Sequence, residues 1–213
     1  APVPPQKEAR RAWRRLDVPL DLLVAGWKTP GRGAPETAAL AVLARVLSGA
    51  ASAPQRALLA DSVGCLSVQA ALDGRRDGGL LYVMAVVRPG ADSARVEAAL
   101  LAQLERLARE PVSEAELDRA RRQEEVATLL GWQTPRGVAD ALGQSRLVDG
   151  DGRAAALRLE QVRRLTAADV QRAAAAVLVP AGRSLLWVST TRPAAPAGGG
   201  RARPGLSSLQ GGR

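Results

Sequence analysis

The sequence predicts an α+β domain in which a mainly antiparallel sheet is covered by helices on one face. Three observations lead to this fold class. A period-two segment comes first, a hairpin of two apolar strands follows a helical segment, and a last strand comes after several helices. Neither strict strand–helix alternation nor an all-helical pattern fits this order. A single domain of this length buries roughly 70% of the surface that its unfolded chain exposes.

The domain is expected to span residues 10–192. Residues 1–9 form a Pro-rich leader, and residues 193–213 are rich in Pro, Gly and Arg, which predicts a flexible tail. The chain does not begin with Met and its start lacks the apolar core of a signal peptide, which indicates a processed or truncated start. No uninterrupted apolar run approaches the ~20 residues of a membrane span.

The first half of the domain is predicted to alternate strands and short helices. A half-buried strand is expected from about Trp13 to Trp27, and Pro19 within it favours a sheet edge or a bulge. Its alternating apolar residues are Leu16, Val18, Leu20, Leu22 and Val24. A helix opens at Pro35 and Glu36 and ends at Gly49. A short helix at 55–60 and a hairpin with strands near 66–72 and 80–87 follow.

The second half is predicted to be helical until its last strand. A helix over 93–109 places an apolar residue on one face at every third or fourth position. The segments VSEAEL (112–117) and LTAADV (165–170) both carry the capping-box pattern, with Ser or Thr three residues before an acid. The helix that begins at the first of these boxes is expected to end near residue 130, where GWQTPRG interrupts the helical pattern. Two further helices are expected through VADALGQSRLV and RAAALRLEQVRRL. A strand at 184–189 closes the domain.

The residue types exclude several kinds of catalyst. The chain has no His, which removes imidazole as a general base, as a triad member and as a zinc ligand. Its single Cys65 lies at the start of an apolar strand, where an inert buried thiol is expected. No catalytic residue and no metal site are therefore predicted in this chain.

The net charge of +9 raises the possibility of nucleic-acid binding. The arginines are spread over most helices and often stand beside acids, and the chain has few aromatic residues for base stacking. Solvated helix faces explain this pattern better than a nucleic-acid surface. Only the cluster at 10–15 and the tail residues Arg201 and Arg203 favour the alternative of a basic nucleic-acid-binding module.

Several weak motifs occur together in a familiar order. They are LSG at 47–49, the hairpin RRDGGLLYV at 75–83, VSEAELDRAR at 112–121, and LTAADVQRAA at 165–174. In this order the chain resembles the C-terminal, non-zinc domain of the pitrilysin, insulinase and mitochondrial processing peptidase group, the inverzincin metallopeptidases. The resemblance covers residues 10–192. It implies a half-domain of a clamshell that closes around a peptide.

In that family the other half-domain carries the zinc motif H-x-x-E-H, with Glu as general base. The non-zinc half supplies an Arg and, seven residues later, a Tyr, which bind substrate and stabilise the oxyanion. The resemblance places Leu59 and Leu66 at these two positions, and neither can donate a hydrogen bond. Arg56, one helical turn before Leu59, is retained as a candidate substrate-binding residue.

The resemblance therefore implies a non-catalytic domain that pairs with a zinc-bearing domain or subunit to form a peptide-binding chamber for proteolysis. Zinc is expected only in that partner. Such a half-domain can also present a sheet edge to an extended peptide. The alternative is a structural scaffold subunit that no longer takes part in proteolysis. Relatives of this shape in bacteria suggest a periplasmic or exported protein, while the residues themselves do not indicate a compartment.

Overall fold

The computed structural model describes residues 6–50, 52–191 and 193. Most of the predicted leader and tail, including Arg201 and Arg203, thus lies outside the described residues. The strands are β1 (Arg10–Arg15), β2 (Asp21–Thr29), β3 (Cys65–Gly74), β4 (Gly79–Val87) and β5 (Ser184–Ser189). The helices are α1 (Thr37–Ser48), α2 (Ala53–Leu58), α3 (Ser93–Arg109), α4 (Glu114–Gly131), α5 (Pro135–Gln144), the π-helix η1 (Ser145–Asp149), α6 (Ala154–Arg164), α7 (Ala167–Val177) and the 3₁₀ turn η2 (Pro180–Gly182).

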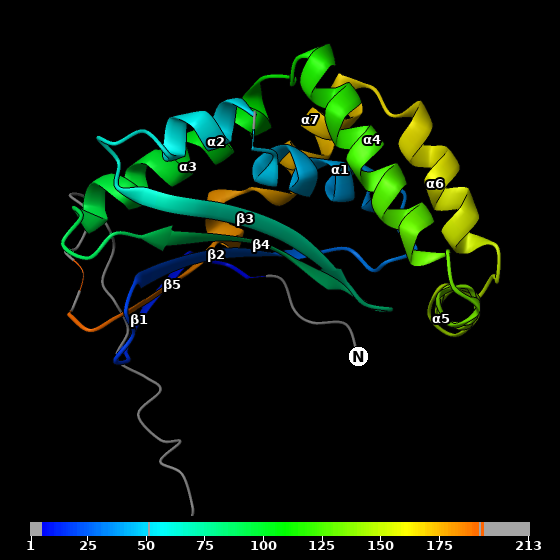
Figure 1. Ribbon diagram of the computed structural model, residues 1–213, viewed down its shortest axis with the longest axis horizontal. Coiled ribbons are helices and arrows are strands. Elements are labelled where there is room, and N and C mark those ends of the chain that lie inside the picture. The colour runs from blue at the N-terminus through cyan, green and yellow to red at the C-terminus, as the bar shows by residue number, and fades with distance from the viewer. Residues whose placement is uncertain (1–5, 51, 192, 194–213) are drawn as a thin grey trace, which may run out of the picture.

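The five described strands form one open sheet in the order β1-β5-β2-β4-β3. The β1–β5 pair is parallel, and the β5–β2, β2–β4 and β4–β3 pairs are antiparallel. Helices lie on one face of this sheet, as Figure 1 shows from the side. The prediction of a mainly antiparallel sheet with a one-sided helix layer is therefore confirmed.

The prediction of a single strand from about Trp13 to Trp27 is wrong. Two strands occupy this region, and the chain bends at Pro19 and Leu20 between them. Proline cannot donate to a strand ladder, so the chain leaves the sheet here and re-enters it two positions away. β1 lies at the sheet edge, but β2 lies in its centre between β5 and β4.

The face that β2 turns to the core also differs from the expectation. Leu23, Ala25 and Trp27 are buried under the helices, whereas Leu22 and Val24 point to the opposite face and are half-buried. The error arises because both faces of β2 carry apolar residues, so that apolarity alone cannot set the phase of a period-two pattern.

The helix layer is anchored by α1, which is buried along most of its length between the sheet and the outer helices. Both predicted capping boxes are present. Ser113 accepts the backbone N–H of Glu116, and the Glu116 side chain accepts the N–H of Ser113. Thr166 and Asp169 repeat this reciprocal pair at the start of α7. Each box satisfies two N–H groups that would otherwise lack partners at a helix start.

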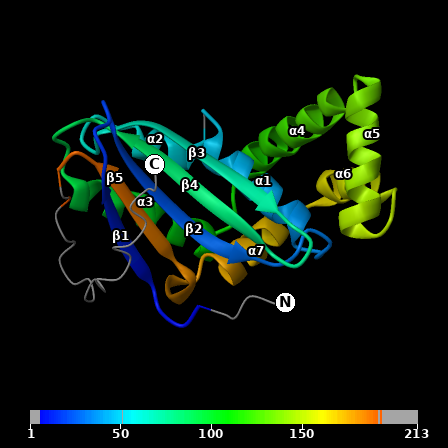
Figure 2. The ribbon, with the colours of Figure 1, turned by 90° about the horizontal axis from the view of Figure 1, so that it is seen from below.

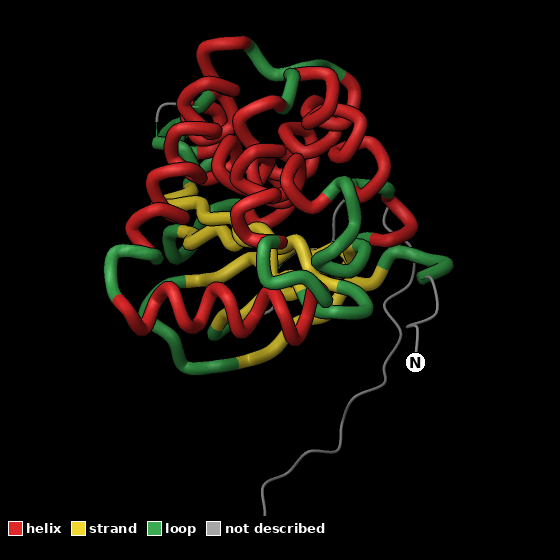
Figure 3. Tube along the Cα trace, turned by 90° about the vertical axis from the view of Figure 1, so that its right-hand side faces the viewer, coloured by secondary structure: helices red, strands yellow, loops and turns green. Residues whose placement is uncertain are grey.

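α5 departs from the one-sided layer. It lies beyond the strand ends and beside the sheet, as Figures 1 and 3 show from two directions, and Figure 2 shows α4, α5 and α6 extending past the sheet. None of its residues is buried. By length and composition, one stretch (Thr37–Leu58) could cross a bilayer, but it includes the undescribed Ala51 and 65% of its most apolar window is buried in the domain. Burial of this kind is typical of a core helix.

Candidate functional site

The residues at the predicted Arg and Tyr positions lie at one corner of the domain, where α2 leads into β3. Ser52 caps α2 by accepting the N–H of Gln55, and Leu58 anchors the helix in the core. The chain then turns through Gly64, whose φ of +90° favours glycine. A Cβ built at Gly64 would also come within 2.8 Å of the Ala91 Cβ. The corner therefore has a fixed geometry.

Leu59 and Leu66 are both exposed at this corner, by 38% and 45%. β3 has a register irregularity between Cys65 and Ser67, which shifts its pairing with β4 by one residue there. Leu59 and Leu66 both carry aliphatic side chains that cannot donate a hydrogen bond. The assignment of Leu59 and Leu66 stays a prediction.

Arg56 is exposed on α2, one turn before Leu59. Its place at the same corner is compatible with the role considered for it in substrate binding, and that role also stays a prediction. A single guanidinium without a neighbouring transition-state donor can bind a peptide oxygen, but it does not reproduce the donor pair of an oxyanion site.

The open face of the sheet is the larger surface near this corner. Among the described elements no helix covers it, as Figure 2 shows from below. Most of the apolar side chains on this face are half-buried, and Leu80 at its end is exposed. Val24 lies beside Met84 of β4 and Leu186 of β5 in the sheet register. The further apolar members of this surface, which we call the open sheet face, are Leu22, Leu80, Tyr82, Val86 and Val188.

No group of three His, Cys, Asp or Glu residues is placed to bind a metal ion among the described residues. Burial raises the pKa of the Cys65 thiol, which keeps it protonated and unreactive at neutral pH. What the open sheet face offers is apolar contact area from neighbouring strands.

The sequence reasoning missed two buried carboxylates. Glu97 of α3 accepts hydrogen bonds from Arg11 Nε (3.1 Å) and from the indole N–H of Trp187 (3.0 Å), which ties both edge-side strands to the helix layer. Asp149 of η1 lies between two arginines. Glu97 interrupts the apolar stripe of its helix, and this interruption is a sequence signal for a buried carboxylate. No pattern in the sequence relates Asp149 to Arg32 and Arg158.

Comparison with known proteins identifies the type of domain. The sequence matches the family model described as the peptidase M16 inactive domain over residues 1–124. A solved structure from Bordetella pertussis Tohama I, named as a candidate zinc protease, is 30% identical with a TM-score of 0.71; the match covers 81% of this chain and 96% of that chain. The inactive peptidase domain of a Bordetella parapertussis protein is 28% identical with a TM-score of 0.74, over 92% of this chain and 99% of that chain.

A protease from Helicobacter pylori shares the fold with a TM-score of 0.77 at 22% identity. The match covers 87% of this chain but only 45% of that one, so the chain spans less than half of the Helicobacter protein. No match was found among curated protein sequences.

Proposed function

Because this chain belongs to the peptidase M16 inactive-domain family, we propose that it is the non-catalytic half of a zinc peptidase. In this proposal it pairs with a half-domain or subunit that carries H-x-x-E-H and zinc, and the two enclose a peptide-binding chamber. Zinc in the partner half would supply the activated water for hydrolysis of the peptide bond. The present chain supplies a wall of the chamber and contacts to the peptide.

The observation that carries this proposal is the open sheet face. A soluble domain rarely leaves a continuous apolar surface without a binding role. Here aliphatic side chains from β5, β2 and β4 lie side by side on a face that no described helix covers. Such a surface suits an apolar or extended peptide because it contributes contact area without a catalytic group.

The residues at the α2–β3 corner support the proposal that the zinc-bearing half provides the oxyanion donors. An oxyanion donor contributes about 3–4 kcal/mol to transition-state stabilisation, and the exposed Leu59 and Leu66 cannot contribute any of it. In the proposed pair, the donors come from the zinc-bearing half. Arg56 then contacts the peptide from the corner.

The partner is proposed to be either an upstream part of the same polypeptide or a separate subunit. The match to the Helicobacter protease, which leaves more than half of that chain uncovered, leaves room for a second half in a longer protein. The near-complete coverage of the two Bordetella chains is compatible with a separate unit of this size. We further propose a periplasmic or exported location, which cell fractionation with a tagged chain would test.

Co-expression tests the proposed function. The chain is produced with each H-x-x-E-H domain encoded upstream of it or in the neighbouring gene, and light scattering measures association. Peptidase activity is then measured for each component and for the mixture. We expect a one-to-one complex whose activity exceeds that of the zinc-bearing half alone. A complex without a gain in activity would favour the scaffold alternative, and the absence of any complex would refute the proposal.

A matched pair of variants separates the open sheet face from the rest of the surface. Met84→Glu places a charge among aliphatic neighbours on that face, and Ala102→Glu places the same charge on the exposed side of α3. We expect Met84→Glu to lower kcat/KM of the complex at least tenfold while Ala102→Glu leaves it unchanged. Equal effects of the two variants would show that the open sheet face has no special role.

A further inference from the structure

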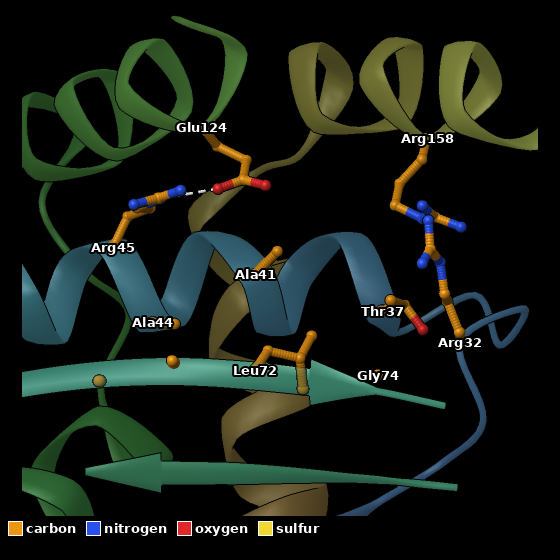
Figure 4. Close-up of a pocket in the computed structure, with 11 residues that line it drawn as sticks. Arg32, Thr37, Ala41, Ala44, Arg45, Leu72, Gly74, Glu124 and Arg158 are labelled. Atoms are coloured by element: carbon orange, nitrogen blue, oxygen red, sulfur yellow. Dashed lines mark hydrogen bonds and ion pairs between the residues drawn. The ribbon is translucent and has the colours of Figure 1, made fainter. Parts of the chain in front are cut away.

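A groove of about 280 Å³ lies on the other side of the sheet, between α1 and the outer edge of β3 (Figure 4). On the helix side it is lined by Ala41 and Ala44, whose small side chains leave the space open. On the strand side it is lined by Leu72 and Gly74. Side chains of α4 and α6 overhang the groove, as Figure 4 shows for Glu124 and Arg158. It is separate from the open sheet face.

The edge of β3 is closed along one part and open along another. The Ser48 hydroxyl accepts the N–H of Ala70 (2.7 Å) and lies 3.0 Å from the Ala70 carbonyl oxygen. The Gln55 side chain donates to the carbonyl of Val68. In an antiparallel strand the outward backbone groups recur at every second residue, so the next outward pair belongs to Leu72. Leu72 lines the groove itself, and no described side chain caps its outward pair.

One end of the groove carries an excess of positive charge. Arg32 Nε lies 3.5 Å and Arg158 Nη2 lies 3.0 Å from the same Oδ2 of Asp149. The Asp149 side chain is only 3% exposed, and its other oxygen has no hydrogen-bond partner among the described residues. One carboxylate therefore forms ion pairs with two guanidinium groups, which leaves a net positive charge among these three side chains. Burial lowers the pKa of Arg32 most, the facing charge of Arg158 lowers it further, and Asp149 acts in the opposite direction.

The other end of the groove is balanced. Arg45 Nε donates to Glu124 Oε2 at 2.7 Å, and this pair lies between α1 and α4 (Figure 4). The groove thus combines an uncapped strand edge, small apolar walls and a single cationic end. Gly74 brings the strand to that end, since a Cβ built on it would lie 3.6 Å from the Arg32 Cβ.

We propose that this groove binds an extended peptide segment that pairs with the backbone of Leu72 and places a carboxylate at Arg32 and Arg158. Two residues of extended chain span ~7 Å, which is the step from Leu72 to Gly74 and the cationic end. The carboxylate would complete the coordination of two arginines that share Asp149, as charge-assisted hydrogen bonds do. Binding here requires neither zinc nor the partner half, so it can fail or succeed independently of the proposed function.

The carboxylate can belong to a peptide C-terminus or to an acidic side chain, and three labelled peptides distinguish the two. All are built on one six-residue sequence of β-branched residues, in which a Glu replaces one internal residue of the third peptide only. The first has a free C-terminus, the second a C-terminal amide, and the third an amide with an internal Glu. Fluorescence anisotropy with the full chain is expected to show at least tenfold tighter binding of the first or the third peptide than of the second. Equal binding of all three, or no binding of any, overturns the proposal.

Variants then locate the site. Arg158→Gln should weaken binding of the carboxylate peptide roughly tenfold, and Ala41→Leu should abolish it by filling the groove. Arg95→Gln and Ala102→Leu make the same changes on the exposed side of α3 and should leave the affinity unchanged. Unchanged binding by Arg158→Gln or Ala41→Leu contradicts the assignment. Thermal melts establish that each variant is folded, and Arg158→Lys, which keeps the charge, should retain more affinity than Arg158→Gln.

Discussion

Glu116 links the start of α4 to the start of α2, and its removal should destabilise the domain measurably. Its Oε1 accepts the N–H of Ala53 at 2.7 Å, and its Oε2 accepts the Ser113 hydroxyl at 2.9 Å and the Ser113 N–H at 3.4 Å. Glu116→Ala breaks the capping box, at a cost of about 1 kcal/mol, and leaves the Ala53 N–H unpaired, at about another 1 kcal/mol. The free energy of unfolding should fall by about 2 kcal/mol, and Tm by ~4–8 °C.

The pH dependence of this loss follows from the charge on Glu116. Burial acts to raise the pKa of Glu116, but the hydrogen bonds from Ala53 and Ser113 outweigh it, so that the pKa lies below its ordinary value. A carboxylate with a lowered folded-state pKa stabilises the native state above its unfolded-state pKa of about 4.3. This contribution disappears as the pH falls through the folded-state pKa. The difference between wild type and Glu116→Ala should thus be full at pH 7 and shrink below about pH 4.

Urea unfolding at pH 7 and at pH 3.5, followed by far-UV circular dichroism, measures both effects. Glu114→Ala is the matched control, because Glu114 lies in the same first turn of α4 and is exposed. It should change the unfolding free energy by less than about 0.5 kcal/mol. A loss for Glu116→Ala no larger than that of the control, or a loss that persists unchanged at pH 3.5, would refute the reasoning.

Three further predictions concern the core and the turn at the α2–β3 corner. Glu97→Ala should lower the free energy of unfolding by about 2–4 kcal/mol in urea titrations, because it removes the buried partner of Arg11; a loss below 1 kcal/mol would contradict this role. Cys65 should react with a thiol reagent only after unfolding, and rapid labelling of native protein would contradict its burial. Gly64→Ala should lower Tm, since its φ is positive and its Cβ would meet a neighbour, whereas Gly143→Ala, which meets nothing on a helix, should not. Equal Tm values for the two glycine variants would show that the turn is not strained.

Much of the fold could be predicted because local patterns agree with it. The capping boxes at Ser113 and Thr166 mark two helix starts correctly, since caps depend on nearby residues. The failures are those where tertiary context decides. The phase of β2 depended on which face the helices cover, and the position of β1 depended on a parallel pairing with β5 at the far end of the sequence. Neither choice is visible in the residues of the strands themselves.

The candidate site was predictable only in part. The absence of His excluded catalysis by a triad or a histidine-based metal site from composition alone, and the family match confirms an inactive domain. The open sheet face was not predicted, because the sequence indicates the strands but not which face of them the helices cover. The groove at β3 depends on Arg32, Asp149 and Arg158, which are distant in the sequence and meet only in the folded chain. Long-range ion pairs of this kind leave no periodic signal.

A peptidase assay on the purified chain, with and without a zinc-bearing half-domain, tests the account most directly. Loaded with Zn²⁺ and free of other proteins, the chain alone should leave a quenched fluorogenic peptide intact. Addition of its H-x-x-E-H partner should produce cleavage that a metal chelator abolishes and that exceeds the partner's own rate. Chelator-sensitive cleavage by the chain alone, in the same fractions as the protein itself, would contradict the proposal that it is a non-catalytic half.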